Sequence, residues 1–490
     1  MTNKNTLTSP GSGPDEIETL YEQASLLMTQ GELQAARDMF MQVLSINPAH
    51  LGTLINFAVL LVQTGFNSAA KTAYLQALSN HPGSLLAHVN LANLYFQERR
   101  FKEAQEHYDR VLQLFQSLCE KKQVDVEVTA QCAHAHQGLA LIYFEEGLRE
   151  KADFHHLKGF GLEPLRRYAH PPNPVAKSLL VLIGGRGGDI PWPTITDPKI
   201  FAIETLAVEF WREKSLNLKP PSSYDLVLNA IGDADSSSVC LRAAQSFLNS
   251  AQRVNLLNPP DAVLLTGRIS NAERFKNLPF VKTATSLVAN KENLQDSISV
   301  KKLLDSKVSF PVLIRSLGFQ TGKHFELAST PDELVAIAHN LPGDELLVME
   351  FLGVPDEQGY FRKYRVMFID GEMYPLHLAL SKHWKVHYFS AEMKDSIENR
   401  LKEKFFLENM HQSLGQKAWT ALAAIKKSLG LDYAGVDFGL SSDGSVLVYE
   451  ANATMIMALP PSDEIWDYRR KPIQKAKDAA TQMLFKKSGF

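Results

Sequence analysis

Glu450 and Asn452 end a predicted β-strand with two oxygen-bearing side chains. Residues 446–449 are apolar and partly β-branched, and they follow the turn Ser442-Asp443-Gly444, a pattern typical of a strand. Residues two apart in a strand point to the same side. We therefore expect the Glu450 carboxylate and the Asn452 carboxamide to project together, with Ala451 facing away.

A second carboxylate, that of Asp437, lies on the preceding predicted strand, thirteen residues before Glu450. The turn at residues 441–444 predicts that the two strands are antiparallel neighbours, so that Asp437, Glu450 and Asn452 converge. Two carboxylates alone would repel each other, and a cation resolves that repulsion. Carboxylate and amide oxygens suit Mg²⁺, which prefers near-octahedral oxygen coordination and shares its shell with phosphates. The three residues therefore predict a magnesium site.

The segments before this site predict two kinds of sheet. Strand and helix patterns alternate over residues 175–300, which indicates an α/β domain. Asp370-Gly371, between two apolar runs, predicts a hairpin. From residue 310 onward the pattern indicates antiparallel strands at residues 310–315, 324–327, 345–351, 364–369 and 372–380. A predicted helix at residues 410–429 then precedes the Asp437 strand.

The two carboxylate segments carry a resemblance to a known superfamily. Residues 310–460 resemble the ATP-grasp carboxylate–amine ligases, and Val436-Asp437-Phe438-Gly439 with residues 448–454 (VYEANAT) looks like their Mg²⁺ signature. The resemblance implies ATP and one or two Mg²⁺ ions as cofactors, with Asp437, Glu450 and Asn452 as metal ligands. It also implies an α+β ATP-grasp fold over residues 301–490, preceded by an α/β pre-ATP-grasp domain at residues 175–300.

The resemblance assigns nucleotide-binding roles to four residues. Arg315 and Lys323 would neutralise the α- and β-phosphates. Glu350 and the Leu352 backbone would bind adenine. This chain departs from the family at Arg315-Ser316, where Lys-Pro is usual, and arginine presents a planar fork rather than a point charge. It also has Lys363 where a ribose-binding acid is often found, so the ribose contact is unassigned.

The resemblance assigns catalytic roles to two further residues. Arg365 would face the γ-phosphate, and Lys382 would lie near an acylphosphate. Trp384, Lys385 and His387 are candidates for shaping the substrate pocket. Outside these segments, Arg268 either faces a cleft or lies on the surface, and the run Arg469-Arg470-Lys471 is interpreted as a solvated helix start.

The first third of the chain repeats with a period of 34 residues. Small, aromatic, glycine and proline positions recur: Ala24, Ala58 and Ala92; Ala36, Ala70 and Ala104; Phe40, Tyr74 and Tyr108; Gly31 and Gly65; Pro48 and Pro82. A fourth unit follows after a 14-residue insertion, with Ala140, Gly147, Ala152 and Pro164. The third unit departs, with Arg99 at the glycine place and Gln116 at the proline place. This pattern resembles the tetratricopeptide repeat, in which helix pairs stack through small residues.

Composition and length limit the remaining possibilities. The 490 residues suggest several domains, and a net charge of −3 argues against a general nucleic-acid binder. No apolar run is long enough to span a membrane. Residues 1–14 lack the apolar segment of a secretory signal and are interpreted as a disordered leader, so that a cytoplasmic location and three free cysteines are expected. We place the helical repeats at residues 15–168.

The resemblance to the ATP-grasp superfamily implies an ATP-dependent ligase that activates a carboxylate as an acylphosphate and joins it to an amine. The substrates would be small molecules or peptides. The helical repeats would bind a peptide, a protein or a partner enzyme, or would serve as a scaffold. Two alternatives remain open: a phosphotransferase on the same fold, and a non-catalytic adaptor that retains the ligase fold as a scaffold. Specificity lies in loops, so the carboxylate and the amine are not identified.

Overall fold

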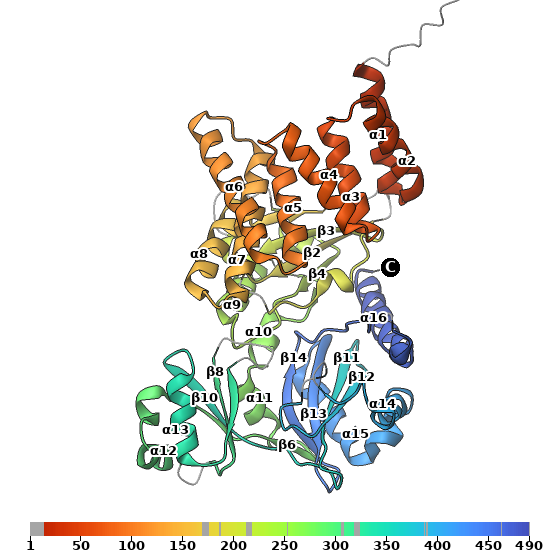
Figure 1. The fold of residues 1–490 in the computed structure, drawn as a ribbon. Coiled ribbons are helices and arrows are strands. Elements are labelled where there is room, and N and C mark those ends of the chain that lie inside the picture. The colour runs from red at the N-terminus through yellow and green to blue at the C-terminus, as the bar shows by residue number, and fades with distance from the viewer. Residues whose placement is uncertain are drawn as a thin grey trace, which may run out of the picture. The chain divides into compact units, whose positions relative to one another are not determined.

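The computed structural model describes residues 14–168, 176–185, 188–211, 218–251, 253–304, 308–317, 324–386, 388, 391–461 and 463–489. The chain divides into two compact units, Met1–Pro164 (the repeat unit) and Leu165–Phe490 (the second unit), each considered by itself below (Figure 1). The leader at residues 1–13, Lys323 and His387 lie outside the described residues.

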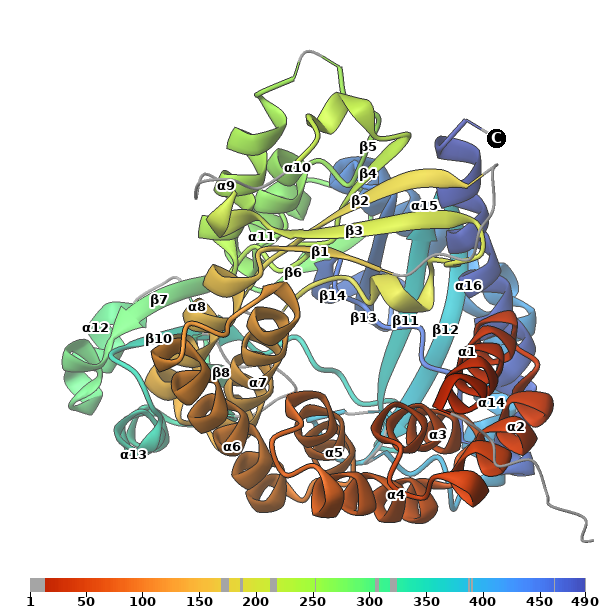
Figure 2. The ribbon, with the colours of Figure 1, turned by 90° about the horizontal axis from the view of Figure 1, so that it is seen from above.

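The repeat unit consists of four helix pairs that lie side by side along an arc (Figure 2). The pairs are α1 (Pro14–Gln30) with α2 (Leu33–Ile46), α3 (Leu51–Gln63) with α4 (Asn67–Asn80), α5 (Leu85–Gln97) with α6 (Phe101–Glu120), and α7 (Val126–Glu145) with α8 (Arg149–Leu162). Helices α6 and α7 are each 20 residues long, whereas α2 to α5 have 13 or 14, so the predicted insertion lengthens helices and the loop between them.

The predicted 34-residue period is confirmed by burial and backbone conformation. The small residues of the first three units are fully buried: Ala24, Ala36, Ala58, Ala70, Ala92 and Ala104. Gly31, Gly65 and Gly147 lie between paired helices with φ of 84°, 84° and 80°, a left-handed conformation that favours glycine. Arg99 takes the same place with φ 59°. Gln116, without the ring of a proline, continues α6 to Glu120.

The second unit begins with an α/β layer. Its sheet has the order β1-β3-β2-β4-β5, with β1 antiparallel and the other strands parallel. The strands are β1 (Leu165–Arg167), β2 (Lys177–Ile183), β3 (Phe201–Ala207), β4 (Leu226–Asn229) and β5 (Leu256–Leu257), and they pack with α9 (Ser238–Leu248) and α10 (Pro260–Leu264). Because β1 pairs with β3, residues 165–167 belong to this unit rather than to the repeats.

A four-stranded antiparallel sheet follows, in the order β7-β10-β8-β9. Its strands are β7 (Ser286–Asn290), β8 (Val312–Ser316), β9 (Phe325–Ala328) and β10 (Glu345–Glu350). Val312, Ile314 and Val348 face a core with α12 (Ser297–Leu304) and α13 (Pro331–Asn340). Since β7 pairs with β10, its residues belong to this later sheet and not to the α/β domain expected at residues 175–300.

The third sheet has the order β12-β11-β13-β14-β6. Its strands are β6 (Val281–Thr283), β11 (Phe361–Ile369), β12 (Glu372–Ser381), β13 (Tyr433–Leu440) and β14 (Val446–Asn452). The strands are packed with α11 (Arg268–Phe275), α14 (Ile397–Glu408), α15 (Met410–Leu429) and α16 (Asp467–Lys487) (Figure 1). Asp370 and Gly371 have φ of 46° and 83°, which confirms the predicted hairpin.

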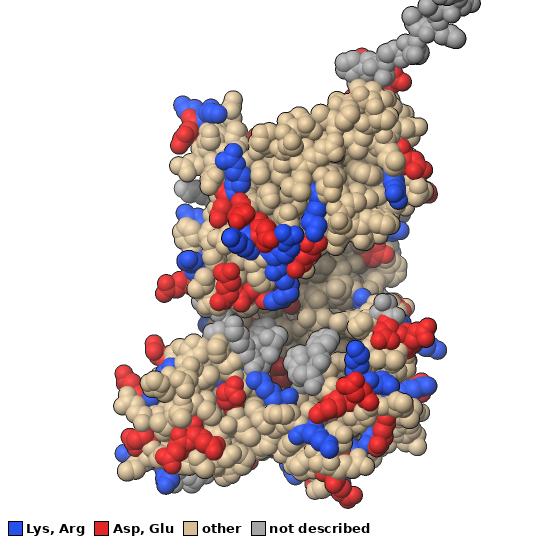
Figure 3. Space-filling model, viewed as in Figure 1, with Lys and Arg blue, Asp and Glu red and all other residues tan. Residues whose placement is uncertain are grey.

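The surface charge fits the near-neutral composition. On the face that Figure 3 shows, acidic and basic side chains of the second unit are interspersed and form no patch of one sign. None of the described helices combines the length and hydropathy that a membrane span requires.

Candidate functional site

The β13–β14 hairpin brings Asp437, Glu450 and Asn452 together. The strands pair antiparallel, as predicted, with Asp437 opposite Glu450 and Gly435 opposite Asn452. A register shift after Asp437 leaves Tyr449 as the extra residue of a β-bulge, a feature that re-aims neighbouring side chains. Glu450 and Asn452 both line one large cavity, whereas Ala451 is buried, so the expected projection is confirmed.

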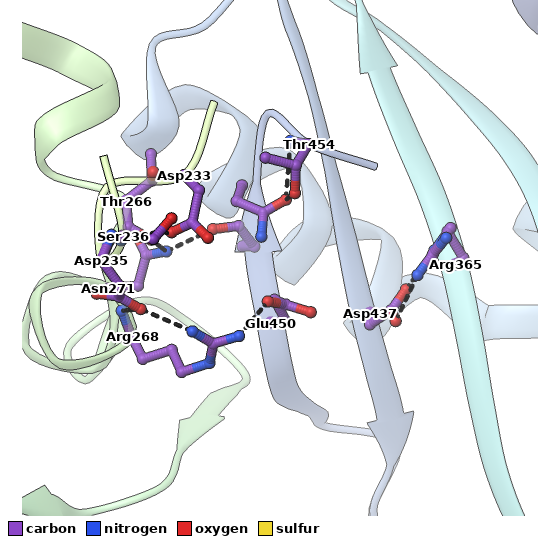
Figure 4. A network of polar contacts seen from close by, with 12 residues as sticks. Asp233, Asp235, Ser236, Thr266, Arg268, Asn271, Arg365, Asp437, Glu450 and Thr454 are labelled. Carbon is purple, nitrogen blue, oxygen red and sulfur yellow. Dashed lines mark hydrogen bonds and ion pairs between the residues drawn. The ribbon is translucent and has the colours of Figure 1, made fainter. Parts of the chain in front are cut away.

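Two cations, of which Figure 4 shows Arg365, hold the Asp437 carboxylate. Arg365, its neighbour on β11, donates from Nε to Oδ1 at 2.6 Å and from Nη2 to Oδ2 at 2.9 Å. Lys363 Nζ lies 3.1 Å from Oδ2. Burial alone would raise the pKa of Asp437, but the charges of Arg365 and Lys363 lower it well below its usual range. Asp437 is therefore an ionised carboxylate in a buried position.

Glu450 is held by an arginine at the start of α11. Arg268, the first residue of α11, donates from Nη2 to Glu450 Oε1 at 2.6 Å and from Nη1 to Asp235 Oδ2 at 2.7 Å (Figure 4). The sequence left open whether Arg268 faces a cleft or lies on the surface, and in the structure it lines the cavity. The bridge connects the loop after β4 to the carboxylate strand.

Thr454 and Asn271 fix the end of β14. Asn452 Oδ1 accepts hydrogen bonds from the Thr454 backbone nitrogen at 3.1 Å and from its hydroxyl at 3.0 Å (Figure 4). Asn271 Nδ2 donates to the Ala451 carbonyl at 2.6 Å. The carboxamide of Asn452 is thus oriented by its own turn, and a metal at Oδ1 would replace one of the Thr454 hydrogen bonds.

The cavity measures about 1110 Å³ and lies between the four-stranded sheet and the third sheet. Of the residues given nucleotide, catalytic or metal roles from sequence, seven line it: Arg315, Glu350, Leu352, Arg365, Asp437, Glu450 and Asn452. Trp384 and Lys385, the described candidates for shaping the substrate pocket, line it as well. Lys382 is exposed, with its amine 5.5 Å from the Tyr360 ring centroid, and is not among the described residues that line the cavity. Lys382 directly follows β12, and the chain turns there, so its side chain lies outside the cavity lining.

Arg315 and Glu350 lie on neighbouring strands of the four-stranded sheet. Arg315 is buried on β8, 5.6 Å from the Phe325 ring centroid. Burial and, to a smaller extent, the positive charge of Arg268 lower the pKa of Arg315 to about 10, so the group stays cationic at neutral pH. Glu350 Oε2 accepts a hydrogen bond from the Thr285 backbone nitrogen at 3.3 Å.

Four cationic residues of the cavity were missed or undervalued from sequence. Lys385 donates to the Phe325 carbonyl at 2.8 Å, and Lys363 and Arg268 pair with the two carboxylates. Arg469, expected to be solvated, is only 7% exposed, so that expectation is wrong. The alternation Phe361, Lys363, Arg365 on one face of β11 was a readable signal, whereas Arg268 and Arg469 depend on packing between distant segments.

The first comparison with known proteins concerns the repeats. Residues 17–50 and 55–118 match family models described as tetratricopeptide repeat, which confirms that prediction. Among solved structures, MamA from Desulfovibrio magneticus RS-1 (residues 41 to the end) is 19% identical, with 31% of this chain and 77% of that chain covered and a TM-score of 0.25. The search of curated proteins found no match.

Two solved structures align over a larger share of the chain. The VanG D-Ala:D-Ser ligase from Enterococcus faecalis is 13% identical and covers 64% of this chain and 99% of its own, with a TM-score of 0.37. The ADP complex of PurK, an N5-carboxyaminoimidazole ribonucleotide synthetase, is 15% identical and covers 63% and 78%, with a TM-score of 0.36. Likeness at this level does not decide function, which must follow from the geometry of the cavity.

Proposed function

We propose that the second unit is an ATP-dependent ligase of the ATP-grasp type, which activates a carboxylate as an acylphosphate and joins it to an amine. The supporting observation is the hairpin that presents Asp437, Glu450 and Asn452 beside Lys363 and Arg365 in one cavity. Structural ion pairing alone needs no carboxamide and no cavity. A nucleotide site needs metal ligands and phosphate-binding cations together.

The residues present fit Mg²⁺. The donor set is two carboxylates and one carboxamide, all oxygen ligands, on adjacent strands. Among the described residues, no group of three His, Cys, Asp or Glu side chains gathers to hold an ion by protein ligands alone. Mg²⁺ usually completes its coordination shell with water and phosphate oxygens. When bound, Mg²⁺ would neutralise the charge that develops on the phosphates.

The protein's own residues supply the other parts of such a site. We propose that Arg315 and Lys363 bind the phosphates of ATP from the two facing sheets and that Arg365 faces the γ-phosphate. Glu350 and the Leu352 backbone would bind adenine. Lys323, outside the described residues, keeps its proposed place at the phosphates. Lys385 is a better candidate than Lys382 for a cation near the transferred group, because Lys385 lines the cavity.

The reaction divides into two balanced steps. The substrate carboxylate oxygen attacks the γ-phosphorus, the bond to the β-phosphate oxygen breaks, and ADP leaves. The amine then attacks the acyl carbon, the C–O bond to phosphate breaks, and amide, phosphate and a proton are released. Positioning and charge neutralisation supply most of the acceleration in such transfers. The repeat unit would bind a peptide or protein partner through its stacked helices.

Calorimetry with ATP and Mg²⁺ tests this proposal. Wild type should bind ATP only with Mg²⁺, and Glu450→Gln should weaken the binding at least tenfold. Asp443→Asn is a matched control, because it changes a carboxylate to an amide in the turn of the same hairpin, where Asp443 is half-exposed. Hydroxylamine should trap the acylphosphate as a hydroxamate. Wild type that fails to bind ATP, even with pooled amino acids and peptides, would refute the ligase proposal.

A further inference from the structure

The cavity extends beyond the carboxylates to an end that the nucleotide roles do not use. Along β11 and β12, Phe361 pairs with Ser381 near the proposed adenine site, and Arg365 pairs with His377 farther along. Beyond His377 the lining is mostly apolar and comes from β12, from the segments after β12 and after β14, and from α16: Leu376, Met393, Met457, Leu459, Trp466 and Ile473. Leu459 is 45% exposed at this end, although it is apolar.

Arg469 is a buried charged group in this apolar wall, and Lys394, which follows Met393 and also lines the cavity, is exposed. The guanidinium carbon of Arg469 stacks 4.0 Å from the Tyr388 ring centroid and lies 6.0 Å from that of Trp466. Arg469 Nε lies 3.3 Å from Glu403 Oε1, an ion-pair distance, but without hydrogen-bond geometry. The stacking fixes the plane of the fork, so its direction is set before any ligand arrives.

Glu403 does not use the hydrogen-bonding capacity of this guanidinium. The Glu403 carboxylate is fully buried and accepts hydrogen bonds from the Tyr388 hydroxyl at 3.1 Å and the Tyr468 hydroxyl at 2.6 Å, and from the Leu378 backbone nitrogen at 3.3 Å. Its oxygens are therefore occupied by other donors. Glu403 balances the charge of Arg469 and leaves the fork without an acceptor.

The remaining donors of Arg469 have no described partner. Among the described residues, none accepts a hydrogen bond from its two terminal nitrogens, and the side chain lines the cavity. His377, also buried and in the lining, has an Nδ1 that no described residue hydrogen-bonds. Buried polar groups are normally hydrogen-bonded, so Arg469 and His377 offer two hydrogen-bonding groups to a ligand in the cavity.

We propose that this end of the cavity binds an α-carboxylate that neighbours a large apolar side chain, with the carboxylate held by the fork of Arg469. The ligand is a free amino acid or the C-terminal residue of a peptide, and both present the same chemistry. A planar fork matches a carboxylate bidentately, and the apolar wall accepts the side chain. This inference rests on the proposed ligase function, because it names a substrate class for the same cavity.

Ligand binding without turnover tests the inference. Trp466 lies beside Arg469, so its fluorescence reports on ligand binding at this end. Calorimetry measures the same binding independently. Phenylalanine, its amide, the dipeptide Ala-Phe and glycine are titrated with and without Mg²⁺ and ADP. Phenylalanine or Ala-Phe should bind at least tenfold more tightly than phenylalanine amide and glycine. Preference between the first two distinguishes an amino acid from a peptide terminus.

Two variants separate recognition from structure. Arg469→Lys keeps the charge opposite Glu403 but removes the fork, and it should weaken carboxylate ligands at least tenfold while changing amide binding less than twofold. Lys471→Gln, which removes a charge from an exposed position of the same helix, should change neither. If Arg469→Lys does not fold, the affinities of the wild type for phenylalanine and for phenylalanine amide still decide whether a carboxylate is recognised.

Equal binding of acid and amide, or no binding by any member of the panel, would overturn the inference. Unchanged carboxylate binding in folded Arg469→Lys would reduce Arg469 to a structural partner of Glu403 and would also overturn it. These outcomes are distinct from failure of the ligase proposal, which is decided by Mg²⁺-dependent ATP binding. A protein that binds ATP but not the panel would retain the proposed activity with another substrate.

Discussion

The two units of the chain bury different kinds of polar group. Among the described residues, the buried charged side chains Arg315, Glu403, Asp437 and Arg469 all belong to the second unit. The repeat unit buries alanines and aromatics and, of polar residues, Thr53, His88 and Gln131. Burying a charge is costly unless it is paired, and stacked helices gain nothing from it. The ligase site proposed for the second unit would need such charges to bind phosphates and carboxylates.

The buried charges of the second unit are the place where function and stability compete. The buried charges of the second unit line its cavity or contact residues that do, and each lies near an opposite charge. In the repeat unit, the corresponding requirement is close approach of helices, which small side chains and a neutral interior satisfy. Variants in the second unit should therefore change ligand binding and turnover, whereas variants in the repeat unit should change the stability of that unit.

Tryptophan fluorescence makes the units separable in the full-length protein. All five tryptophans lie in the second unit, at positions 192, 211, 384, 419 and 466. Fluorescence-detected unfolding therefore reports on that unit, and hydrogen exchange of amides in α1 to α8 reports on the repeat unit.

The largest expected effect follows from Asp437→Asn. Turnover, measured by ADP release, should fall at least about 100-fold, because a charged ligand of the proposed metal site becomes neutral. The second unit should also lose about 3 kcal/mol of unfolding free energy, since Arg365 and Lys363 lose their partner. Hydrogen exchange in the repeat unit should not change. Equal turnover in wild type and variant would contradict the site, and Asp443→Asn serves as control.

The second prediction concerns the histidines of the repeat unit. His88 and His107 contact through their Nδ1 atoms at 2.9 Å, and burial lowers the pKa of His88 to about 4. The folded unit then binds fewer protons than the unfolded chain, so its unfolding free energy should fall as pH drops from about 6.5 toward 4. At about 1.4 kcal/mol per pKa unit, the loss from His88 is about 3 kcal/mol.

A double variant, His88→Leu with His107→Ala, checks the origin of this pH dependence. It copies Leu54 and Ala73, which stand 34 residues earlier in the second repeat. Hydrogen exchange at pH 7 and pH 4.5 should show a smaller loss of protection in α5 and α6 than in wild type. An unchanged loss would assign the pH dependence to other groups.

A third, smaller effect is expected at Gly138. An added Cβ would lie 2.2 Å from Tyr108 Cζ, and that ring is buried and hydrogen-bonded to Asn93. Gly138→Ala should destabilise the repeat unit by about 1–3 kcal/mol, because the ring must move in a packed interior. Gly83→Ala is the control, since its Cβ would meet nothing within 4 Å. ADP release should be unaffected at saturating substrate.

The smallest expected effect is at Arg99, the exception in the glycine series. Arg99→Gly removes a Cβ from a left-handed residue, whereas Arg99→Ala keeps it and loses the same contacts with Glu145 and Phe101. The glycine variant should be more stable than the alanine variant by about 1 kcal/mol. Equal stability in hydrogen exchange of α5 and α6 would mean that the turn bears no such strain.

Sequence alone was sufficient wherever local periodicity or pairing rules applied. The 34-residue period, the β13–β14 pairing, the turn at Asp370-Gly371 and the joint projection of Glu450 and Asn452 all follow from spacing. It was insufficient for boundaries: β1 and β7 pair with strands that the sequence does not point to. Short strands carry little signal of their own, and their partners are set by the whole sheet.

The sequence by itself determined the repeats, the two antiparallel strands and the grouping of Asp437, Glu450 and Asn452, because these depend on residues near one another in the chain. Only the tertiary structure decided which cations meet them. Arg268 is 182 residues from Glu450, and Arg469 meets Glu403 from another helix, 66 residues away in the chain. Burial and pairing of charges are properties of the packed chain. For this reason Arg469, which the sequence alone places on the surface, is buried in the lining of the cavity.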